Sequence, residues 1–374
     1  MNRVILQAAP EELLGGLAGK MAETSQNPRW HGEGNVLAHT KLVTKAMTES
    51  PVFINTDDQT RQILYLTAVF HDIGKIRTTR LEDGRLVSPG HTRAGAEMAR
   101  QILWRDFGLC GTPEKQRMRE TICGLIRCHS LPPYAIENES GRLQLLRAAA
   151  NGELIPSFTV RLLCALSETD ALGRICDDKE DMLDRIALCA ELAKETGCYD
   201  GPYPFPTAHT AYACLSGRQV GPAYPLYDDT WGEVILLSGL PGTGKDTWIK
   251  DNCPDLPMIS LDEIRAELKM PPTQNQGKVV DMARERAKEL LRRKQSFVWN
   301  ATNILPMTRK QQIDLFAAYG ASVRVVYLET GWDEQLRRNA ERKDAVPESA
   351  VSDMLEKLTP PERFEAHRVE WHCV

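Results

Sequence analysis

The chain has 374 residues, a formal net charge of −5, 42% hydrophobic residues and 26% charged residues. That length suits two domains better than one, and the composition is typical of a soluble globular protein. No apolar run approaches the ~20 residues that cross a membrane, so we expect no membrane partner. The negative balance offers no global basic signature for nucleic acid, so any site for a polyanion has to be a local patch.

Two further features bear on the compartment. The N-terminal segment meets two glutamates soon after a short apolar stretch, which makes it a poor export signal. The ten cysteines are scattered, and none forms a Cys-x-x-Cys pair. Both features are typical of a reducing environment, and we expect a cytoplasmic protein.

In chain order, the pattern changes twice. Residues 1–195 have apolar residues at three- and four-residue spacing, as in TRQILYLTAVFHDIGK and FTVRLLCALSETDALGRI, which predicts helices. Residues 196–230 are rich in Pro, Gly and Tyr and are interpreted as a connector. Residues 231–374 alternate short apolar strands with helical segments, which predicts an α/β domain with a parallel sheet. The fold class expected is therefore multidomain, all-α and then α/β.

Within the first 195 residues, one order of side chains is typical of a metal centre. His39, His71, Asp72, His91, His129 and Asp170 occur in that order, and each except His91 is expected within or at the end of a helix. A helical bundle can direct such residues to a common centre. Any one of these histidines on its own is more often a packed or surface residue than a ligand. Lys75, in FHDIGK, either neutralises a phosphate or pairs with a carboxylate.

The string SGLPGTGKDTW, between a predicted strand and a predicted helix, has the spacing of a phosphate-binding loop. Backbone N–H groups of such a loop and the following helix N-terminus attract phosphates, and Lys245 would reach the β- and γ-phosphates. The nucleotide-binding candidates in the loop are Gly239, Gly242, Thr243, Gly244, Lys245, Asp246 and Thr247.

Asp246 stands where such loops usually carry the Ser or Thr that holds magnesium. A carboxylate is a hard oxygen ligand that suits Mg²⁺. We expect strict metal dependence of nucleotide binding, relaxed in Asp246→Ser. In the alternative, Asp246 points away and Thr247 contacts the nucleotide.

Further along, ISLDEIRAELK places Asp262 and Arg265 one helical turn apart, so both can face the same way. A carboxylate just beyond a strand end can accept a proton from an incoming hydroxyl. Taken alone, however, the segment also fits a solvated, charged helix start. Farther on, WDEQLRRNAERKDAVP places Arg337, Arg338, Arg342 and Lys343 on one expected helix. Arg338 and Arg342 would share a face and close over a triphosphate, or belong to a salt-bridged surface helix.

Together, GLPGTGKDTW, LDEIR, NATNILPMTR and RRNAERKDAVP resemble the polynucleotide kinase branch of P-loop phosphotransferases over roughly residues 233–360. The resemblance implies that Asp262 is the general base on a 5′-hydroxyl, that Arg265 supports the acceptor and that Arg342 is a lid arginine. It implies ATP or another NTP with Mg²⁺ as cofactor. The acidic residue often found just before Thr-Asn is absent. The remaining acceptor-binding candidates are Asn300, Thr302, Asn303 and, more weakly, Arg309.

The histidine and aspartate order resembles the HD-domain metal-dependent phosphohydrolases over roughly residues 30–180. The resemblance implies a two-metal centre. One metal would be held by His39, His71, Asp72 and Asp170, and the other by His91 and His129 with Asp72 bridging. Imidazole-rich ligation suits transition metals such as Mn, Co, Ni, Fe or Zn. His31 is left without a role.

The order of the two modules resembles the bacterial HD-domain/polynucleotide-kinase RNA end-healing enzymes. That resemblance implies removal of 2′,3′-cyclic, 2′- or 3′-phosphates by the HD module and phosphorylation of a 5′-hydroxyl by the kinase. The expected partners are RNA ends, with DNA ends as an alternative, and a separate RNA ligase. Two other hypotheses remain: an HD nucleotidase fused to a nucleoside or metabolite kinase, and a non-catalytic ATP-gated RNA-binding or signalling protein.

Overall fold

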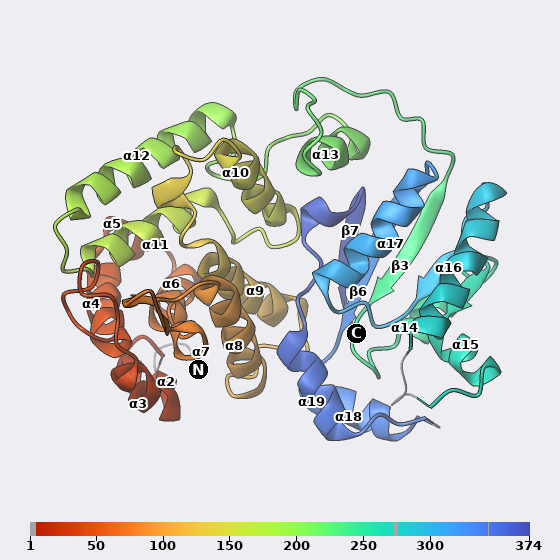
Figure 1. The fold of residues 1–374 in the computed structure, drawn as a ribbon, viewed down its shortest axis with the longest axis horizontal. Helices are drawn as coiled ribbons and strands as arrows, with labels where there is room; N and C mark the ends of the chain where they lie inside the picture. Colours follow the sequence, from red (N-terminus) through yellow and green to blue (C-terminus); the bar gives the residue numbers. More distant parts are fainter. Residues whose placement is uncertain (1–4, 272–275, 343) are drawn as a thin grey trace. The chain divides into compact units, whose positions relative to one another are not determined.

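The computed structural model describes residues 5–271, 276–342 and 344–374 (Figure 1). The chain forms two compact units, Met1–Leu109 with Glu114–Tyr203, and Cys110–Pro113 with Pro204–Val374. Residues 204–230 therefore lie in the second unit, where the side chain of Thr207 caps helix α13 (Ala208–Leu215). Within the described ranges, no helix is both long enough and apolar enough to span a bilayer.

The first unit is built from helices and one short hairpin. Its helices are α2 (Pro10–Leu14), α3 (Gly16–Glu23), α4 (Val36–Glu49), α5 (Pro51–Ile54), α6 (Asp58–Phe70), α7 (Lys75–Thr78), α8 (His91–Arg105), α9 (Pro113–Cys128), η1 (Pro132–Tyr134), α10 (Gly141–Ala150), η2 (Asn151–Glu153), α11 (Val160–Leu172) and α12 (Lys179–Thr196).

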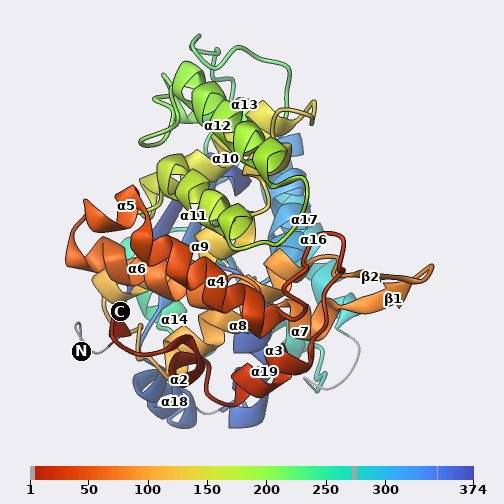
Figure 2. The same ribbon diagram turned by 90° about the vertical axis from the view of Figure 1, so that its left-hand side faces the viewer.

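Helix α6 is the centre of this unit. All nine residues from Gln62 to Phe70 are buried, which is typical of a helix that neighbours surround on every side. Its start is fixed by Asp57, whose carboxylate accepts a hydrogen bond from the Thr60 amide. Helices α4, α6 and α11 contact one another, and α4 and α11 are seen beside each other in Figure 2. The expectation of a helical domain is confirmed.

The hairpin is the feature that an all-α prediction misses. Strands β1 (Arg80–Glu82) and β2 (Arg85–Val87) pair antiparallel around Asp83 and Gly84, and they extend from the helices in Figure 2. Both turn residues have positive φ, 48° and 75°, as a two-residue hairpin turn requires. The Asp-Gly dipeptide is the sequence signal for this turn.

One glycine controls how the next helices meet. A Cβ atom on Gly74 would lie 2.0 Å from the carbonyl oxygen of His91 and 2.4 Å from the amide nitrogen of Gly95. The backbone before α7 therefore lies directly against the first turn of α8. This close approach brings the His-Asp pair at 71–72 near His91.

The second unit is an α/β domain with a five-stranded parallel sheet in the order β4-β5-β3-β6-β7, as expected for residues 231–374. Its strands are β3 (Glu233–Ser238), β4 (Met258–Ser260), β5 (Val298–Asn300), β6 (Ser322–Glu329) and β7 (Arg368–Cys373). Its helices are α13, α14 (Lys245–Asn252), α15 (Leu261–Glu267), α16 (Gly277–Arg292), α17 (Pro306–Ala318), α18 (Trp332–Ala340), α19 (Glu348–Lys357) and η3 (Arg363–Glu365).

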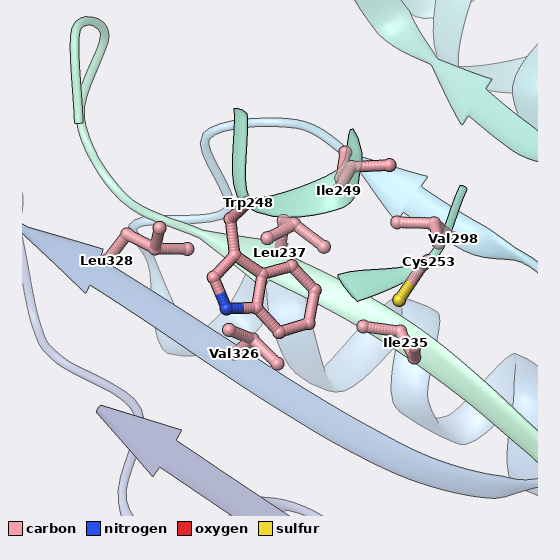
Figure 3. Close-up of a cluster of buried hydrophobic side chains, with 8 residues drawn as sticks. All are labelled: Ile235, Leu237, Trp248, Ile249, Cys253, Val298, Val326 and Leu328. Atoms are coloured by element: carbon pink, nitrogen blue, oxygen red, sulfur yellow. The ribbon is translucent and has the colours of Figure 1, made fainter. Parts of the chain in front are cut away.

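The central strand β3 is buried from Val234 to Ser238, as the near-continuous apolar sequence of an inner parallel strand predicts. Helix α14 packs on the sheet through Trp248 and Ile249, whose side chains join a cluster of buried apolar residues (Figure 3). The other members of the cluster are Ile235, Leu237, Cys253, Val298, Val326 and Leu328. This packing fixes the loop that joins β3 to α14.

Candidate functional site

The first unit gathers four imidazoles and two carboxylates into one buried cluster. His39 comes from α4, His71 and Asp72 follow α6, His91 begins α8, His129 follows α9 and Asp170 lies on α11. His91 was expected outside a helix, and it is the first residue of one. Each successive pair of rings has a centroid distance of 5.3–5.5 Å: His39 with His71, His71 with His129, and His129 with His91.

Three of these histidines are held in the same way. The Nδ1 atoms of His71, His91 and His129 lie 2.8, 2.9 and 2.7 Å from the backbone carbonyls of Ala68, Ser88 and Ile126, each three residues earlier. Those contacts select the tautomer with the proton on Nδ1. The Nε2 atom is then unprotonated, and its lone pair can bind a metal. Orientation of this kind, by a second partner on the far nitrogen, is typical of metal-binding histidines.

The free Nε2 atoms converge on Asp72. The Nε2 of His71 lies 3.4 Å from Asp72 Oδ2, while those of His91 and His129 lie 3.7 and 4.0 Å from Asp72 Oδ1. Among the described residues, His71 Nε2 and Asp72 Oδ1 are buried without a hydrogen-bond partner. Buried polar atoms with no partner are costly unless a ligand satisfies them. The two sets His39–His71–Asp72 and Asp72–His91–His129 each have donor atoms within 4.8 Å of one another, so the residues fit two cations bridged by Asp72.

Asp170 closes the other side of the cluster. Its Oδ1 lies 2.9 Å from His39 Nε2, and its Oδ2 accepts from Arg174 Nη2 at 2.7 Å. Burial alone would raise the pKa of Asp170, but the charge of Arg174 and the hydrogen bond with His39 hold it well below its usual range. Arg174 had no role in the sequence analysis, although its position four residues after Asp170 on an expected helix was the signal that could have found it.

The pKa shifts of Asp72, His91 and His129 favour the protonation states that bind a cation. Burial would raise the pKa of Asp72, but the charge of Lys75 keeps it well below its ordinary value. Burial lowers the pKa of His129 to about 3 and also lowers that of His91. An anionic carboxylate and neutral imidazoles are the states that ligate metals.

Lys75 pairs with a carboxylate in this structure. Its ammonium lies 2.7 Å from Asp72 Oδ2 and donates to Gln26 Oε1 at 2.6 Å. The Nε2 of His31 lies 3.5 Å from the same ammonium. His31 is therefore part of the cluster rather than a residue without a role.

Glu33 links two histidines and was not found from the sequence. Its Oε1 lies 2.7 Å from His31 Nδ1 and 2.8 Å from His39 Nδ1. Glu33 thus places a carboxylate beside His39 Nδ1, the ring nitrogen that contacts a backbone carbonyl in the other three ligand candidates. The hydrogen bonds with Asp170 and Glu33 overcome the effect of burial and raise the pKa of His39, so protons and metal compete for this ring.

In the second unit, the loop after β3 has the shape of a phosphate cradle. Gly239 and Gly242 have φ of 146° and 83°, and a Cβ atom at either position would lie within 3.0 Å of a backbone oxygen, that of Leu328 or Gln335. Glycine is therefore required at both. The Lys245 ammonium folds back and donates to the carbonyls of Gly239 and Leu240, both at 2.9 Å. Burial lowers the pKa of this ammonium to about 8.

The remaining loop candidates differ in exposure. Asp246 and Thr247 are exposed at the start of α14, and Arg338 Nη1 lies close to Gly244. Thr243 is buried, and its hydroxyl donates to the carbonyl of Leu240. The Thr243 side chain therefore stabilises the loop itself, and its backbone N–H also donates to the carbonyl of Leu240, at 3.4 Å.

Asp262 is an exposed carboxylate between two arginines. It lies on α15, whose start is capped by Ser260, and its Oδ1 is 2.5 Å from Arg265 Nη1. The Oδ2 is 3.7 Å from Arg342 Nη2. Arg265 also donates to Gln276 Oε1 at 2.8 Å, which fixes the guanidinium. The one-turn spacing predicted from the sequence thus brings Asp262 and Arg265 together.

The lid arginines do not share one helix. Helix α18 ends at Ala340, so Arg338 lies on it, paired with Glu334, while Arg342 lies beyond it. Both polar atoms of the Asn339 side chain bond the backbone of Val346, at 2.6 and 3.2 Å, and close this loop. Lys343 lies outside the described residues.

Two of the acceptor candidates are structural. Arg309 is fully buried, pairs with Glu365 at 2.6 Å and donates to the carbonyls of Asn303 and Thr359. Asn303 is buried with φ of 44°, and its amide donates to Leu237 O at 2.7 Å. Neither side chain is available to an acceptor. The Thr302 carbonyl accepts from the Gly239 amide, so this turn braces the phosphate loop, and Asn300 contacts Asp246.

Comparison with known proteins agrees with this division. Residues 36–157 match the model of the HD domain, and residues 234–361 match a model described as an AAA domain, a P-loop domain of kinase type. The chain thus carries an N-terminal HD phosphohydrolase domain followed by a C-terminal kinase-type P-loop domain.

A segment of the chain is also similar to a curated mouse protein. It is 28% identical over 149 residues to heterogeneous nuclear ribonucleoprotein U-like protein 2 of Mus musculus. The alignment covers 35% of this chain and 20% of that protein, so the chain spans about a fifth of the length of this relative.

Proposed function

We propose that this protein heals broken RNA: its HD domain removes 2′,3′-cyclic, 2′- or 3′-phosphates, and its P-loop domain phosphorylates 5′-hydroxyl ends. The observation that carries the proposal is that one chain holds a buried histidine–aspartate centre and, in its second unit, both a glycine-rich phosphate loop and an exposed carboxylate paired with two arginines. Adding and removing phosphate at one position would be futile. The two activities are useful together when they act on the two different ends of a break.

In the HD domain, two bound cations would supply an activated water and neutralise phosphate charge. The residues that would hold them are His39, His71, Asp72, His91, His129 and Asp170. Lys75 would transfer part of its pairing from Asp72 to a phosphate oxygen of the RNA end. The first attack opens the cyclic phosphate by breaking one of its two ester bonds. A second water then releases inorganic phosphate and leaves a free hydroxyl.

In the P-loop domain, Lys245 would exchange the carbonyls of Gly239 and Leu240 for the β- and γ-phosphates of ATP or another NTP. Asp262 would accept the proton of the 5′-hydroxyl as the oxygen bonds to the γ-phosphorus. The bond from that phosphorus to the β-bridging oxygen breaks, and the nucleoside diphosphate leaves. Arg265 would hold the acceptor, and Arg342 would stabilise the charge that develops on the transferred group.

The RNA assignment rests on the resemblance to end-healing enzymes and on the name of the mouse relative, a ribonucleoprotein. In this proposal the ends that leave the enzyme, a 3′-hydroxyl and a 5′-phosphate, are those that a separate ligase joins. DNA ends are the alternative substrate for the kinase.

The test is one incubation of an RNA that carries a 2′,3′-cyclic phosphate and a 5′-hydroxyl, with ATP and a panel of Mn²⁺, Co²⁺, Ni²⁺, Fe²⁺, Zn²⁺ and Mg²⁺. Asp72→Ala is expected to abolish processing of the 3′ end and spare the kinase, and Lys245→Ala to do the reverse. Free nucleosides and nucleotides are offered in parallel. Turnover of these alone, with intact RNA ends, would replace the proposal with a nucleotidase fused to a small-molecule kinase.

A further inference from the structure

The loop residue Asp246 and the strand residue Asn300 are hydrogen-bonded partners. The Asn300 Nδ2 donates to Asp246 Oδ1 at 2.7 Å. Asp246 follows Lys245 at the start of α14, and Asn300 is the last residue of β5, the strand that pairs in parallel with β3. Asn300 is buried, whereas Asp246 is exposed.

These two positions are the ones from which P-loop enzymes hold magnesium. The usual arrangement places a Ser or Thr hydroxyl on the loop and an Asp carboxylate at a strand end. In this chain the loop carries the carboxylate and the strand end carries a neutral amide. Each arrangement places one carboxylate and one neutral polar side chain at these two positions.

We propose that the carboxylate of the magnesium site has been transposed from the strand to the loop in this chain, and that Asn300 is the positioning residue that aims Asp246 at the ion. The inference rests on the proposed kinase activity and names the residues that would hold its magnesium. It also removes Asn300 from the acceptor contacts expected from the sequence.

The chemistry of the pair supports this assignment. An amide can donate to Asp246 Oδ1, which fixes the carboxylate and leaves Oδ2 for the ion. An aspartate at position 300 could not donate, and two carboxylates at this distance would repel each other strongly. Asp at 246 is therefore compatible with Asn at 300, and Ser at 246 with Asp at 300. Asp at both positions would bring two carboxylates together, and Ser with Asn would supply no carboxylate for the ion.

The experiment is a double-mutant cycle on the full chain with nucleotide binding as its readout. Isothermal titration gives the ATP dissociation constant in Mg²⁺ and in EDTA for wild type, Asp246→Ser, Asn300→Asp and the double variant. We expect Asp246→Ser to reduce the ratio of the EDTA constant to the Mg²⁺ constant at least ~10-fold. Asn300→Asp should raise the ATP dissociation constant in EDTA above that of wild type. The double variant should return the ratio of the two constants to within ~3-fold of wild type.

Two controls separate positioning from folding. Thr247→Val removes the neighbouring hydroxyl and should change both constants alike, leaving the ratio unaltered. Asn300→Ala removes the amide and should weaken ATP binding in Mg²⁺ by several-fold. The melting temperature of each variant shows whether it is folded. If the effects of the two substitutions simply add, or if Thr247→Val alone collapses the ratio, the transposition is wrong. If the wild-type chain itself fails to bind Mg²⁺ with ATP, the kinase half of the proposed function fails instead.

Discussion

Glu33 shows how much a single side chain outside the ligand set can do. It contacts Nδ1 of both His31 and His39, so it sets the orientation of one ligand candidate and of one neighbour of Lys75. Burial would raise the pKa of Glu33, but its hydrogen bonds with the two histidines hold it far below the usual range. The carboxylate therefore stays anionic beside both Nδ1 atoms.

Replacement of Glu33 by Gln should weaken metal binding by ~10–100-fold, because a neutral amide replaces the carboxylate whose charge lies beside His39 Nδ1. The measurement is the amount of Mn²⁺ bound per chain against a competing chelator. The kinase activity should be unchanged. Glu49→Gln, at the exposed C-terminal end of helix α4, is the matched control. Wild-type Mn²⁺ affinity in the Glu33 variant would contradict the orienting role.

Lys245 gives a pH prediction. With its pKa lowered to about 8, the ammonium of the nucleotide-free chain loses its proton as pH rises through that value. Phosphates restore the charged form, so binding takes up a proton and ATP affinity falls above pH 8, by up to ~10-fold per pH unit. Dissociation constants measured from pH 7.5 to 9.5 test this.

The control for that prediction is Lys245→Arg, whose guanidinium stays charged across the range. Its affinity should be lower overall because the geometry differs, yet flat with pH. Equal slopes in the two proteins would assign the pH dependence to another group.

At the scale of elements, a neutral histidine just before strand β7 is hydrogen-bonded to strand β6. His367 precedes β7, and its Nδ1 accepts the backbone N–H of Val323 at 3.1 Å, which only an unprotonated Nδ1 can do. The ring of Tyr212, on α13, lies 4.0 Å from it, and His209 stacks at 5.7 Å. Burial and the neighbouring His209 lower the pKa of His367 to about 4.

The second unit should therefore lose stability in acid. An unfolded histidine titrates near ~6.5, so the contribution of His367 is complete above that pH and is lost as pH falls toward 4, by roughly 2–3 kcal/mol. Chemical denaturation at pH 7 and pH 4.5 measures the loss. His367→Asn keeps an acceptor for the Val323 amide without the titration, so its loss should be smaller. An equal loss in both proteins would place the acid sensitivity elsewhere.

The Arg309–Glu365 pair joins α17 to η3 in the interior. Because Arg309 is fully buried, Arg309→Met leaves Glu365 without its charge partner and should cost ~3–5 kcal/mol. The free energy of unfolding of the second unit measures this. Where the variant folds, its KM for 5′-hydroxyl RNA should equal that of wild type. A raised KM with unchanged stability would restore Arg309 to the acceptor site.

Across elements, local sequence patterns predicted the architecture but not the tertiary contacts. The apolar spacing around FHDIGK and the VILLSG strand set the helical and parallel-sheet units, because burial of such patterns depends on the residues themselves. The contact of Glu33 with His39 depends on how the 31–35 segment turns back on α4, which no local pattern specifies. The Asn300–Asp246 hydrogen bond joins residues 54 positions apart and needs the strand order of the sheet.

At the scale of the whole molecule, the two ligand classes should act on different unfolding transitions. A ligand that binds only the folded state stabilises it by about 2.7 kcal/mol at a hundredfold excess over its dissociation constant. We expect Mg²⁺ with ATP to raise the melting transition of the P-loop unit, and Mn²⁺ that of the HD unit. Calorimetry of wild type, Lys245→Ala and Asp72→Ala assigns the transitions. An ATP effect that survives Lys245→Ala would argue against the loop as the binding site.

The close backbone contact at Gly74 predicts that this position tolerates no substitution. It contributes no donor atom, yet the smallest side chain would strike the carbonyl of His91 and the amide of Gly95. In a library of all single substitutions selected for 3′-end processing, every codon other than glycine at this position should be depleted as severely as replacements of Asp72. A map of intolerant positions drawn from such a library would mark Gly74 as catalytic, when its role is to let two backbones meet.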